Sequence, residues 1–306
     1  MPILEYHIVD VFTDTPLEGN PLAVVRNTCG LSTERMQAIA REFNLSETTF
    51  IERREGAVEQ AEGVRVRIFT TQEELPFAGH PTLGTASVLK TTAPETVRDG
   101  VVTLALKVGA VPVRFAGEGL NGAMTQRDPE FGAELDAGEV ARLCGLALDE
   151  LDPALTPQVV STGTAFAIVV LRTAEALARL RVDQEPATKF LRERGARWFY
   201  VMAREDDSQP ALMPDQNQDS AKRWGARMQF YGGEDPATGS AAGCAISYLV
   251  RHGAVPSGQQ VHVRQGVAMG RPSDLFLSAR EVDGRIGEVR VGGSTVLVAN
   301  GQLFLP

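Results

Sequence analysis

Apolar residues recur along this chain mainly in short runs of the kind that form β-strands. Residues 3–12 and 21–26 are apolar and rich in β-branched side chains, and the turn-forming segment TDTPLEGN separates them, which predicts a pair of strands. Residues 64–71 alternate between apolar and polar side chains, which is the pattern of a half-buried strand. Similar runs at 101–106 and 111–115, and several more in the last third of the chain, predict a fold with many short strands.

Helical spacing of apolar residues is confined to fewer segments. From Ser32, a residue type favoured at helix N-caps, apolar side chains recur at helical spacing and predict an amphipathic helix that ends near Asn44. Asp136 followed by Glu139 resembles a capping box, and Gly145 suits the position after a helix end. A short helix is therefore expected between Asp136 and Gly145.

Two stretches of small, mostly uncharged residues lie between the strand-like runs. The first is LPFAGHPTLGTASVL at 75–89 and the second is DPATGSAAGCAISYL at 235–249, in which Gly239 lies 160 residues after Gly79. We expect a central helix to begin at each glycine, and Pro81 suits the first turn of such a helix because it has no N–H group to lose there. A helix N-terminus presents free N–H groups and the positive end of the helix dipole, so each start is suited to bind an anion.

The chain also repeats itself outside these two stretches. The segment GTAFAIVV from Gly163 repeats the pattern of GNPLAVV from Gly19, at an offset of 144 residues. Two matching pairs of segments at similar offsets indicate a duplicated architecture, with a site built between two halves. The polar, glycine-containing stretch 121–136 is the expected boundary between the halves.

The composition favours a small-molecule partner. The chain has 306 residues, a formal net charge of −9 and a pI near 5.1, so binding to nucleic acid or to an anionic membrane surface is not expected. No segment approaches the ~18 apolar residues that a membrane span needs. Cys29, Cys144 and Cys244 are far apart and form no CxxC pair, which predicts reduced, mostly buried thiols in a cytoplasmic protein.

Several familiar chemical signatures are absent from the sequence. Neither GHPTLGT nor GEDPATGS supplies the Lys of a phosphate-binding loop, and neither contains GxGxxG, so nucleotide binding is not expected. The four histidines, at positions 7, 80, 252 and 262, show no metal-ligand spacing. We therefore expect no metal and no cofactor.

Four polar residues remain as candidates for chemistry. Glu47 lies in the connection NLSETTF, His80 follows Gly79, and Asp235 and Ser240 belong to the second small-residue stretch. Each has an ordinary structural explanation, because Asp before Pro often caps a helix, a lone turn His is usually satisfied locally, a loop Glu is usually solvated, and a Ser suits a small-residue helix start. Taken alone, these residues do not decide between structure and catalysis.

Four separated segments resemble the hallmark segments of one family. NLSETTF with Glu47, ELPFAGHPTLGTA with His80, EDPATGSAAG with Asp235 and Ser240, and QGVAMGRPS from Gln265 resemble, in this order along nearly the whole chain, the PhzF family of phenazine-biosynthesis isomerases. The resemblance implies an α+β fold of the diaminopimelate epimerase type, with two pseudo-symmetric domains, each a curled antiparallel sheet or barrel around a central helix. The domains expected from it are residues 1–122, completed by a last strand at 296–305, and residues 123–295, with a cleft between them.

The resemblance also implies a chemistry. Amino-acid epimerases of this fold use one Cys from each half, and the corresponding places here hold Ala78 and Pro236, so a thiol-based racemase is not expected. The resemblance to the PhzF family implies that Glu47 is the general acid/base. It also implies that a second set of residues binds substrate or relays protons: His80, Asp235, Ser240, Gly79 and Gly239. The implied protein is a cofactor-independent, homodimeric isomerase that acts on a small carboxylate-bearing compound, similar to trans-2,3-dihydro-3-hydroxyanthranilate isomerase.

Two other functions stay open at the level of sequence. A Ser hydrolase could use Ser240, His80 and Asp235 as its triad, although GSAAG does not match the GxSxG of a nucleophile elbow. A non-catalytic binder of small molecules would use the same helix starts without moving a proton.

Overall fold

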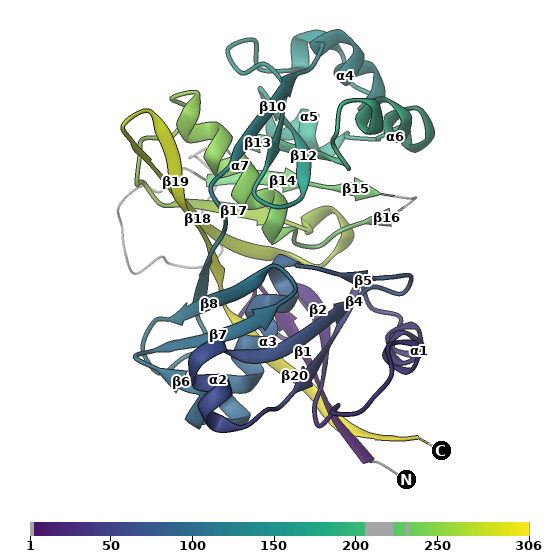
Figure 1. Ribbon diagram of the computed structural model, residues 1–306. Helices are drawn as coiled ribbons and strands as arrows, with labels where there is room; N and C mark the ends of the chain where they lie inside the picture. Colours follow the sequence, from purple (N-terminus) through teal and green to yellow (C-terminus); the bar gives the residue numbers. More distant parts are fainter. Residues whose placement is uncertain (1–2, 206–222, 231–232, 306) are drawn as a thin grey trace. The chain divides into compact units, whose positions relative to one another are not determined.

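The computed structural model describes residues 3–205, 223–230 and 233–305 and divides the chain into two compact units (Figure 1). Unit 1 consists of Met1–Thr125 together with Gly292–Pro306, and unit 2 consists of Gln126–Val291. The polypeptide therefore leaves unit 1, builds unit 2 and returns to finish unit 1.

Unit 1 is a sheet that curls around its longest helix. Its strands are β1 (Ile3–Val11), β2 (Asn20–Val25), β3 (Glu47–Glu52), β4 (Val64–Phe69), β5 (Glu74–Leu75), β6 (Val97–Arg98), β7 (Val101–Leu106), β8 (Gly109–Phe115), β9 (Gly122–Thr125) and β20 (Thr295–Phe304). Its helices are α1 (Thr33–Phe43), α2 (Gly56–Glu62) and α3 (Gly79–Thr92), with a 3₁₀ turn at Pro94–Thr96. Strand pairing runs in the order β20, β1, β2, β3, β4, β7, β8, β9.

Helix α3 is enclosed by this sheet. It contacts β1, β2, β3, β7, β8, β9 and β20, and every residue from Gly79 to Leu89 is buried. A helix that is covered on all sides needs no polar face, which explains why its sequence of Gly, Ala, Thr, Ser and Leu shows no amphipathic stripe. The expected central helix of the first half is confirmed, and it begins at Gly79.

Unit 2 has the same plan. Its strands are β10 (Glu130–Glu134), β11 (Gln158–Ser161), β12 (Ala165–Leu171), β13 (Phe199–Arg204), β14 (Arg223–Arg227), β15 (Gln229–Phe230), β16 (Gly233–Glu234), β17 (Val261–Gln265), β18 (Ser273–Val282) and β19 (Arg285–Gly293). Its helices are α4 (Ala137–Leu143), α5 (Ala174–Ala178), α6 (Gln184–Glu193) and α7 (Gly239–Arg251), with 3₁₀ turns at Leu148–Glu150 and Val267–Met269. The buried helix α7, which begins at Gly239 as expected, packs on β11, β12 and β18.

The order of paired strands shows the duplication directly. In unit 2 the order is β10, β11, β12, β13, β14, β17, β18, which matches β20, β1, β2, β3, β4, β7, β8 of unit 1. The strand equivalent to β10 is thus β20, from the end of the chain, which pairs with β1 along its whole length.

The sheets are mixed, whereas the resemblance led us to expect antiparallel ones. Most pairs are antiparallel, but β2–β3 and β4–β7 in unit 1, and β12–β13 and β14–β17 in unit 2, are parallel. The reason is that a parallel pair needs a crossover connection, and each of these four connections contains a helix.

Local sequence signals set several helix ends as predicted. The Ser32 hydroxyl accepts a hydrogen bond from the Arg35 N–H at 3.3 Å, and Asn44 ends α1 in the left-handed conformation at φ 51°. Asp136 likewise caps α4 by accepting from the Glu139 N–H at 2.8 Å. The polar helix α2 was not predicted, because GAVEQAE has no periodic apolar face and buries none of its residues.

The enclosure of α3 predicts a destabilising effect of a small substitution. A Cβ at Gly84 would lie 2.7 Å from Leu22 Cδ2 and 2.8 Å from Val11 Cγ2, so we expect Gly84→Ala to lower the free energy of unfolding by about 1–3 kcal/mol. Gly56→Ala is the matched control, because its Cβ would meet no atom within 4 Å, and it is expected to keep or slightly raise stability. Urea unfolding measures both, and equal stability of Gly84→Ala and the wild type would contradict the enclosure.

Candidate active site

Two candidate residues meet in unit 1. Glu47 is the first residue of β3 and His80 is the second residue of α3, and His80 Nε2 lies 3.5 Å from Glu47 Oε2. The two side chains are 6% exposed for His80 and 17% exposed for Glu47. A pair of proton-carrying groups is therefore held at the start of the enclosed helix, almost out of contact with solvent.

The fold fixes this pair from both sides. Glu47 opposes Leu22 in the parallel β2–β3 pair, which places it beside the chain at Pro21. Two residues further along β3, the Thr49 hydroxyl forms a buried hydrogen bond of 2.8 Å with the Thr85 hydroxyl of α3. The strand that carries Glu47 is thus locked in register with the helix that carries His80.

The protonation state of His80 follows from its partners. The ring is hydrogen-bonded to the backbone of Pro21, and because proline has no N–H group, its carbonyl accepts and a ring N–H donates. Nε2 has no hydrogen-bond partner within the described residues, so the donor is Nδ1–H. Burial, opposed in part by the Pro21 hydrogen bond, lowers the pKa of His80 to about 3.

A neutral imidazole that donates through Nδ1 has a lone pair on Nε2. Nε2 lies 3.5 Å from a carboxyl oxygen of Glu47, so a proton taken up by that carboxyl group would have a second acceptor beside it. The contact can therefore receive a proton on Glu47 and stabilise it by hydrogen bonding to Nε2. Chemically, this arrangement suits a group that takes a proton and returns it.

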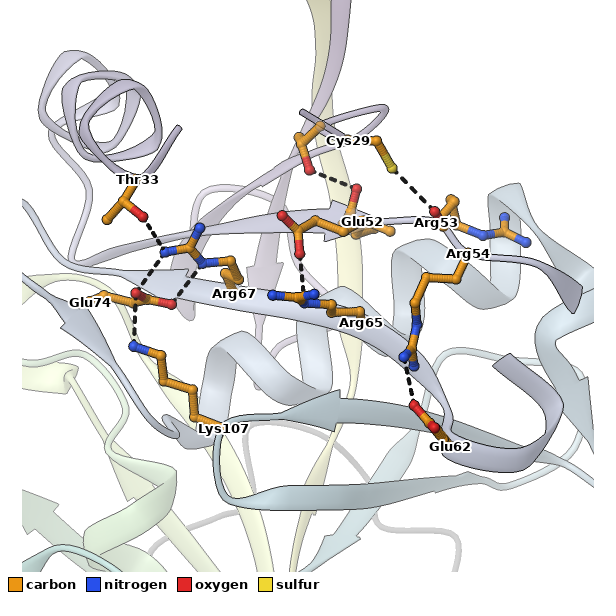
Figure 2. A network of polar contacts seen from close by, with 12 residues as sticks. Cys29, Thr33, Glu52, Arg53, Arg54, Glu62, Arg65, Arg67, Glu74 and Lys107 are labelled. Carbon is orange, nitrogen blue, oxygen red and sulfur yellow. Dashed lines mark hydrogen bonds and ion pairs between the residues drawn. The ribbon is translucent and has the colours of Figure 1, made fainter. Parts of the chain in front are cut away.

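Charged residues anchor the segment that leads into α3, as Figure 2 shows. Arg67 donates two hydrogen bonds of 2.8 Å to Glu74, and Lys107 lies 2.8 Å from the same carboxylate. These partners, Arg67 foremost, hold the pKa of Glu74 below its ordinary value. Since Glu74 lies in β5, shortly before Gly79, this network steadies the turn from which α3 begins.

The start of α3 keeps the features of an anion-binding site. Its N-cap residue is Ala78, which makes no side-chain hydrogen bond, and the first turn contains no acidic residue. The first-turn N–H groups and the positive helix end are thus offered to a ligand instead of a capping side chain.

Unit 2 groups the remaining candidate residues at the start of α7. Gly239 and Ser240 are its first two residues, so Ser240 occupies the position that His80 has in α3. The N-cap residue Thr238 does not cap the helix with its side chain, because its hydroxyl donates to Asp235 Oδ2 at 2.7 Å. Asp235, Gly239 and Ser240 therefore form one local cluster, as Glu47, Gly79 and His80 do in unit 1.

Two buried glutamines that the sequence had not marked as site residues hold this second cluster. Gln126 donates to the Gly239 carbonyl at 2.8 Å and accepts from the Thr162 hydroxyl at 2.7 Å. Gln265, which is 0% exposed, bonds to Asp235 and Thr238. Gln265 belongs to a segment that carried the family resemblance, but Gln126 lies in a polar stretch without any signal.

The cysteines are not suited to catalysis. All three are free, Cys29 is exposed, and burial raises the pKa of Cys144 to about 12 and that of Cys244 to about 11. The two buried thiols therefore stay protonated at neutral pH.

Two other kinds of feature are absent from the part of the chain that the structure describes. No group of three or more His, Cys, Asp or Glu among these residues could hold a metal ion. Within the same residues, no helix combines the length and the apolar character that crossing a membrane requires.

Comparison with known proteins gives a consistent result. The family model of phenazine biosynthesis-like proteins, PhzC-PhzF, matches residues 9–301. Trans-2,3-dihydro-3-hydroxyanthranilate isomerase of Pseudomonas aeruginosa is 35% identical over 308 residues, which cover 98% of this chain and 99% of the relative. A solved predicted epimerase from Pseudomonas aeruginosa is 33% identical, with a TM-score of 0.79 and 99% of both chains covered.

More distant structures share the fold. A PhzF-family phenazine biosynthesis protein of Bacillus anthracis superposes with a TM-score of 0.83 at 23% identity, over 100% of both chains. A hydroxyproline epimerase of Agrobacterium vitis does so with a TM-score of 0.60 at 12% identity, over 99% of this chain and 91% of that one. The predicted fold class is confirmed.

Burial of a neutral His80 predicts a specific pH dependence of stability. The unfolded chain binds a proton on this residue below an ordinary histidine pKa of 6.5, whereas the folded protein binds it only near pH 3, so the free energy of unfolding falls as pH falls through this window. The contribution approaches about 1.4 kcal/mol per pH unit. We expect His80→Asn, which can keep a donor to Pro21, to lose that slope in denaturant unfolding at pH 6.5 to 4. Identical slopes for the variant and the wild type would contradict a buried neutral His80.

Proposed function

The chain belongs to the PhzF family of phenazine biosynthesis-like isomerases, and we propose that it moves a proton within a small carboxylate-bearing substrate without a cofactor. The observation that carries this proposal is the contact between Glu47 and a buried, neutral His80 at the start of α3. The isomerases among its relatives supply the reaction class, and this contact supplies the groups that can perform it.

In the proposed reaction, the Glu47 carboxylate takes a proton from an activated C–H group of the substrate. The electron pair left behind shifts along the conjugated system, and Glu47 then returns the proton to a second carbon. No atom or electron is gained or lost, so the reaction needs no oxidant or reductant. While Glu47 carries the proton, His80 Nε2 accepts a hydrogen bond from it, which stabilises the protonated carboxyl group.

The substrate carboxylate is assigned to the helix starts. We propose that the backbone at Gly79 binds it, because the first turn of α3 has no capping side chain and no acidic residue. Gly239, Ser240 and Asp235 are proposed to bind substrate or relay protons, in keeping with the similar start of α7. No Arg or Lys is needed for this mode of carboxylate binding.

The substrate proposed first is trans-2,3-dihydro-3-hydroxyanthranilate. It is the compound named for the relative that is 35% identical and covered over 99% of its length. It carries the carboxylate and the unsaturated ring that the proposed mechanism requires.

A Ser hydrolase is the less supported alternative. In a triad, Asp235 would orient a histidine, but Asp235 Oδ2 accepts the Thr238 hydroxyl at 2.7 Å. The relatives are isomerases and epimerases, which also disfavours a non-catalytic binder.

We further propose a homodimer, as the family resemblance implies. The expected mass in solution is then twice the 32.9 kDa of one chain. A mass of one chain in light scattering would contradict it.

Removing the acid/base group predicts loss of turnover. Glu47→Gln keeps the size of the side chain and one accepting oxygen but cannot carry a proton between carbons, so we expect the isomerisation rate of trans-2,3-dihydro-3-hydroxyanthranilate to fall at least about 100-fold. Glu52→Gln is the matched control on the same strand, because Glu52 forms an ion pair of 2.7 Å with Arg65 of β4. Figure 2 draws this pair. That variant is expected to retain turnover.

Two outcomes would contradict the proposal. Full turnover of Glu47→Gln would exclude Glu47 as the acid/base. Stoichiometric labelling of Ser240 by a fluorophosphonate would favour the hydrolase instead.

A further inference from the structure

Gln265 sits at the end of β17 with its side-chain amide fully paired. Its Oε1 accepts from the Thr238 N–H and from the Tyr200 hydroxyl, each at 3.1 Å, and its Nε2 donates at 2.9 Å to the Asp235 carbonyl and to the Thr238 hydroxyl oxygen. Gln265 is 0% exposed, and Tyr200 is also fully buried. One amide thus joins β13, β17 and the turn that leads into α7.

The orientation of this amide is determined by its surroundings. A backbone N–H can only donate, so the atom of Gln265 that faces the Thr238 N–H must be the oxygen. The NH₂ group is then directed at the Asp235 carbonyl and at Thr238 Oγ1, both of which can accept.

This orientation sets the direction of a chain of hydrogen bonds. Because Thr238 Oγ1 accepts from Gln265, its own proton is free to point at Asp235 Oδ2, 2.7 Å away. The chain runs from Gln265 through Thr238 to Asp235, and its last bond is the one that the Thr238 hydroxyl donates to Asp235 Oδ2. The same glutamine holds the backbone carbonyl of Asp235, so both the main chain and the carboxyl group are fixed.

We propose that Gln265 and Thr238 are positioning residues that hold Asp235 at the start of α7 as a hydrogen-bond-accepting carboxylate. The inference rests on the proposed function, in which Asp235 serves the substrate. It gives a positioning role to Gln265, the first residue of QGVAMGRPS, and to Thr238, whereas the family resemblance gave no role to either residue.

Gly266 shows how closely this segment is fitted to the turn. It has φ +77°, and a Cβ there would lie 2.2 Å from the Arg271 carbonyl oxygen and 2.7 Å from the Pro236 carbonyl oxygen. Only glycine allows the chain after Gln265 to pass so close to Pro236 in this conformation. The fit keeps Gln265 within hydrogen-bond distance of the turn.

Two titratable or charged groups near Asp235 have partners of their own. Tyr200 of β13 is buried, which raises its pKa, and the charge of Asp235 raises it further, so Tyr200 stays protonated and donates to Gln265. Glu234 of β16 precedes Asp235 and is paired with Arg227 of β14 at 2.6 Å. Thr238 donates directly to Asp235 Oδ2 at 2.7 Å.

The test compares Thr238→Val with Thr238→Ser. Valine has nearly the shape of threonine but removes the hydroxyl, whereas serine keeps it. The ¹³C carboxyl titration of Asp235 in the unliganded protein, assigned with Asp235→Asn, should show its pKa raised by about one unit in Thr238→Val and restored in Thr238→Ser. In turnover, kcat should fall about tenfold in Thr238→Val, with a smaller change in KM and a matching upward shift of the acidic limb of the pH profile.

The outcomes separate this inference from the proposed function. An unchanged Asp235 titration in folded Thr238→Val would overturn the positioning role, whatever the enzyme turns over. If the wild type fails to isomerise the substrate, the proposed function fails, while the titration still decides the role of Thr238. A lower thermal midpoint with an unmoved titration would mean that Thr238 is structural only, which also overturns the inference.

Discussion

The buried imidazole of His80 is the feature on which the proposed chemistry of this protein depends. Burial keeps it neutral, the Pro21 carbonyl fixes its tautomer, and the remaining ring nitrogen is left facing Glu47 at 3.5 Å. Each condition comes from the fold, because α3 is enclosed by a curled sheet and β3 runs parallel to β2. An exposed histidine at the same position would be protonated in mildly acidic solution and would have no defined partner.

The two units share one order of paired strands and one buried central helix, but the side chains at the start of that helix differ. The starts of α3 and α7 both lack a capping side chain, which suits anion binding in either unit. At the second helical position unit 1 has His80 and unit 2 has Ser240, and in unit 2 two buried glutamines, Gln126 and Gln265, bind the start of the helix. The two units therefore share a helix start whose backbone N–H groups have no capping side chain, and they differ in the side chains around it.

The sequence predicted what depends on local or repeated signals. Ser32, Asn44 and Asp136 end helices through bonds to residues a few positions away, and Gly79 and Gly239 were found by repetition. The parallel strand pairs were not predicted, because strand direction depends on which distant strands pair. Gln126 was not predicted either, because its hydrogen-bond partner Gly239 is 113 residues away in the sequence. The roles of Glu47 and His80 came from family resemblance, and their contact became visible only in the structure.

The most direct test is a crystal structure of the protein with an unreactive carboxylate-bearing ring compound that lacks the transferable proton. We expect the ring carbon equivalent to the proton donor to lie within about 3–3.5 Å of a Glu47 carboxyl oxygen. We also expect the ligand carboxylate to accept hydrogen bonds from backbone N–H groups at a helix start. A ligand bound in the protein away from Glu47, with its carboxylate held by surface Arg or Lys side chains, would contradict the proposed mechanism.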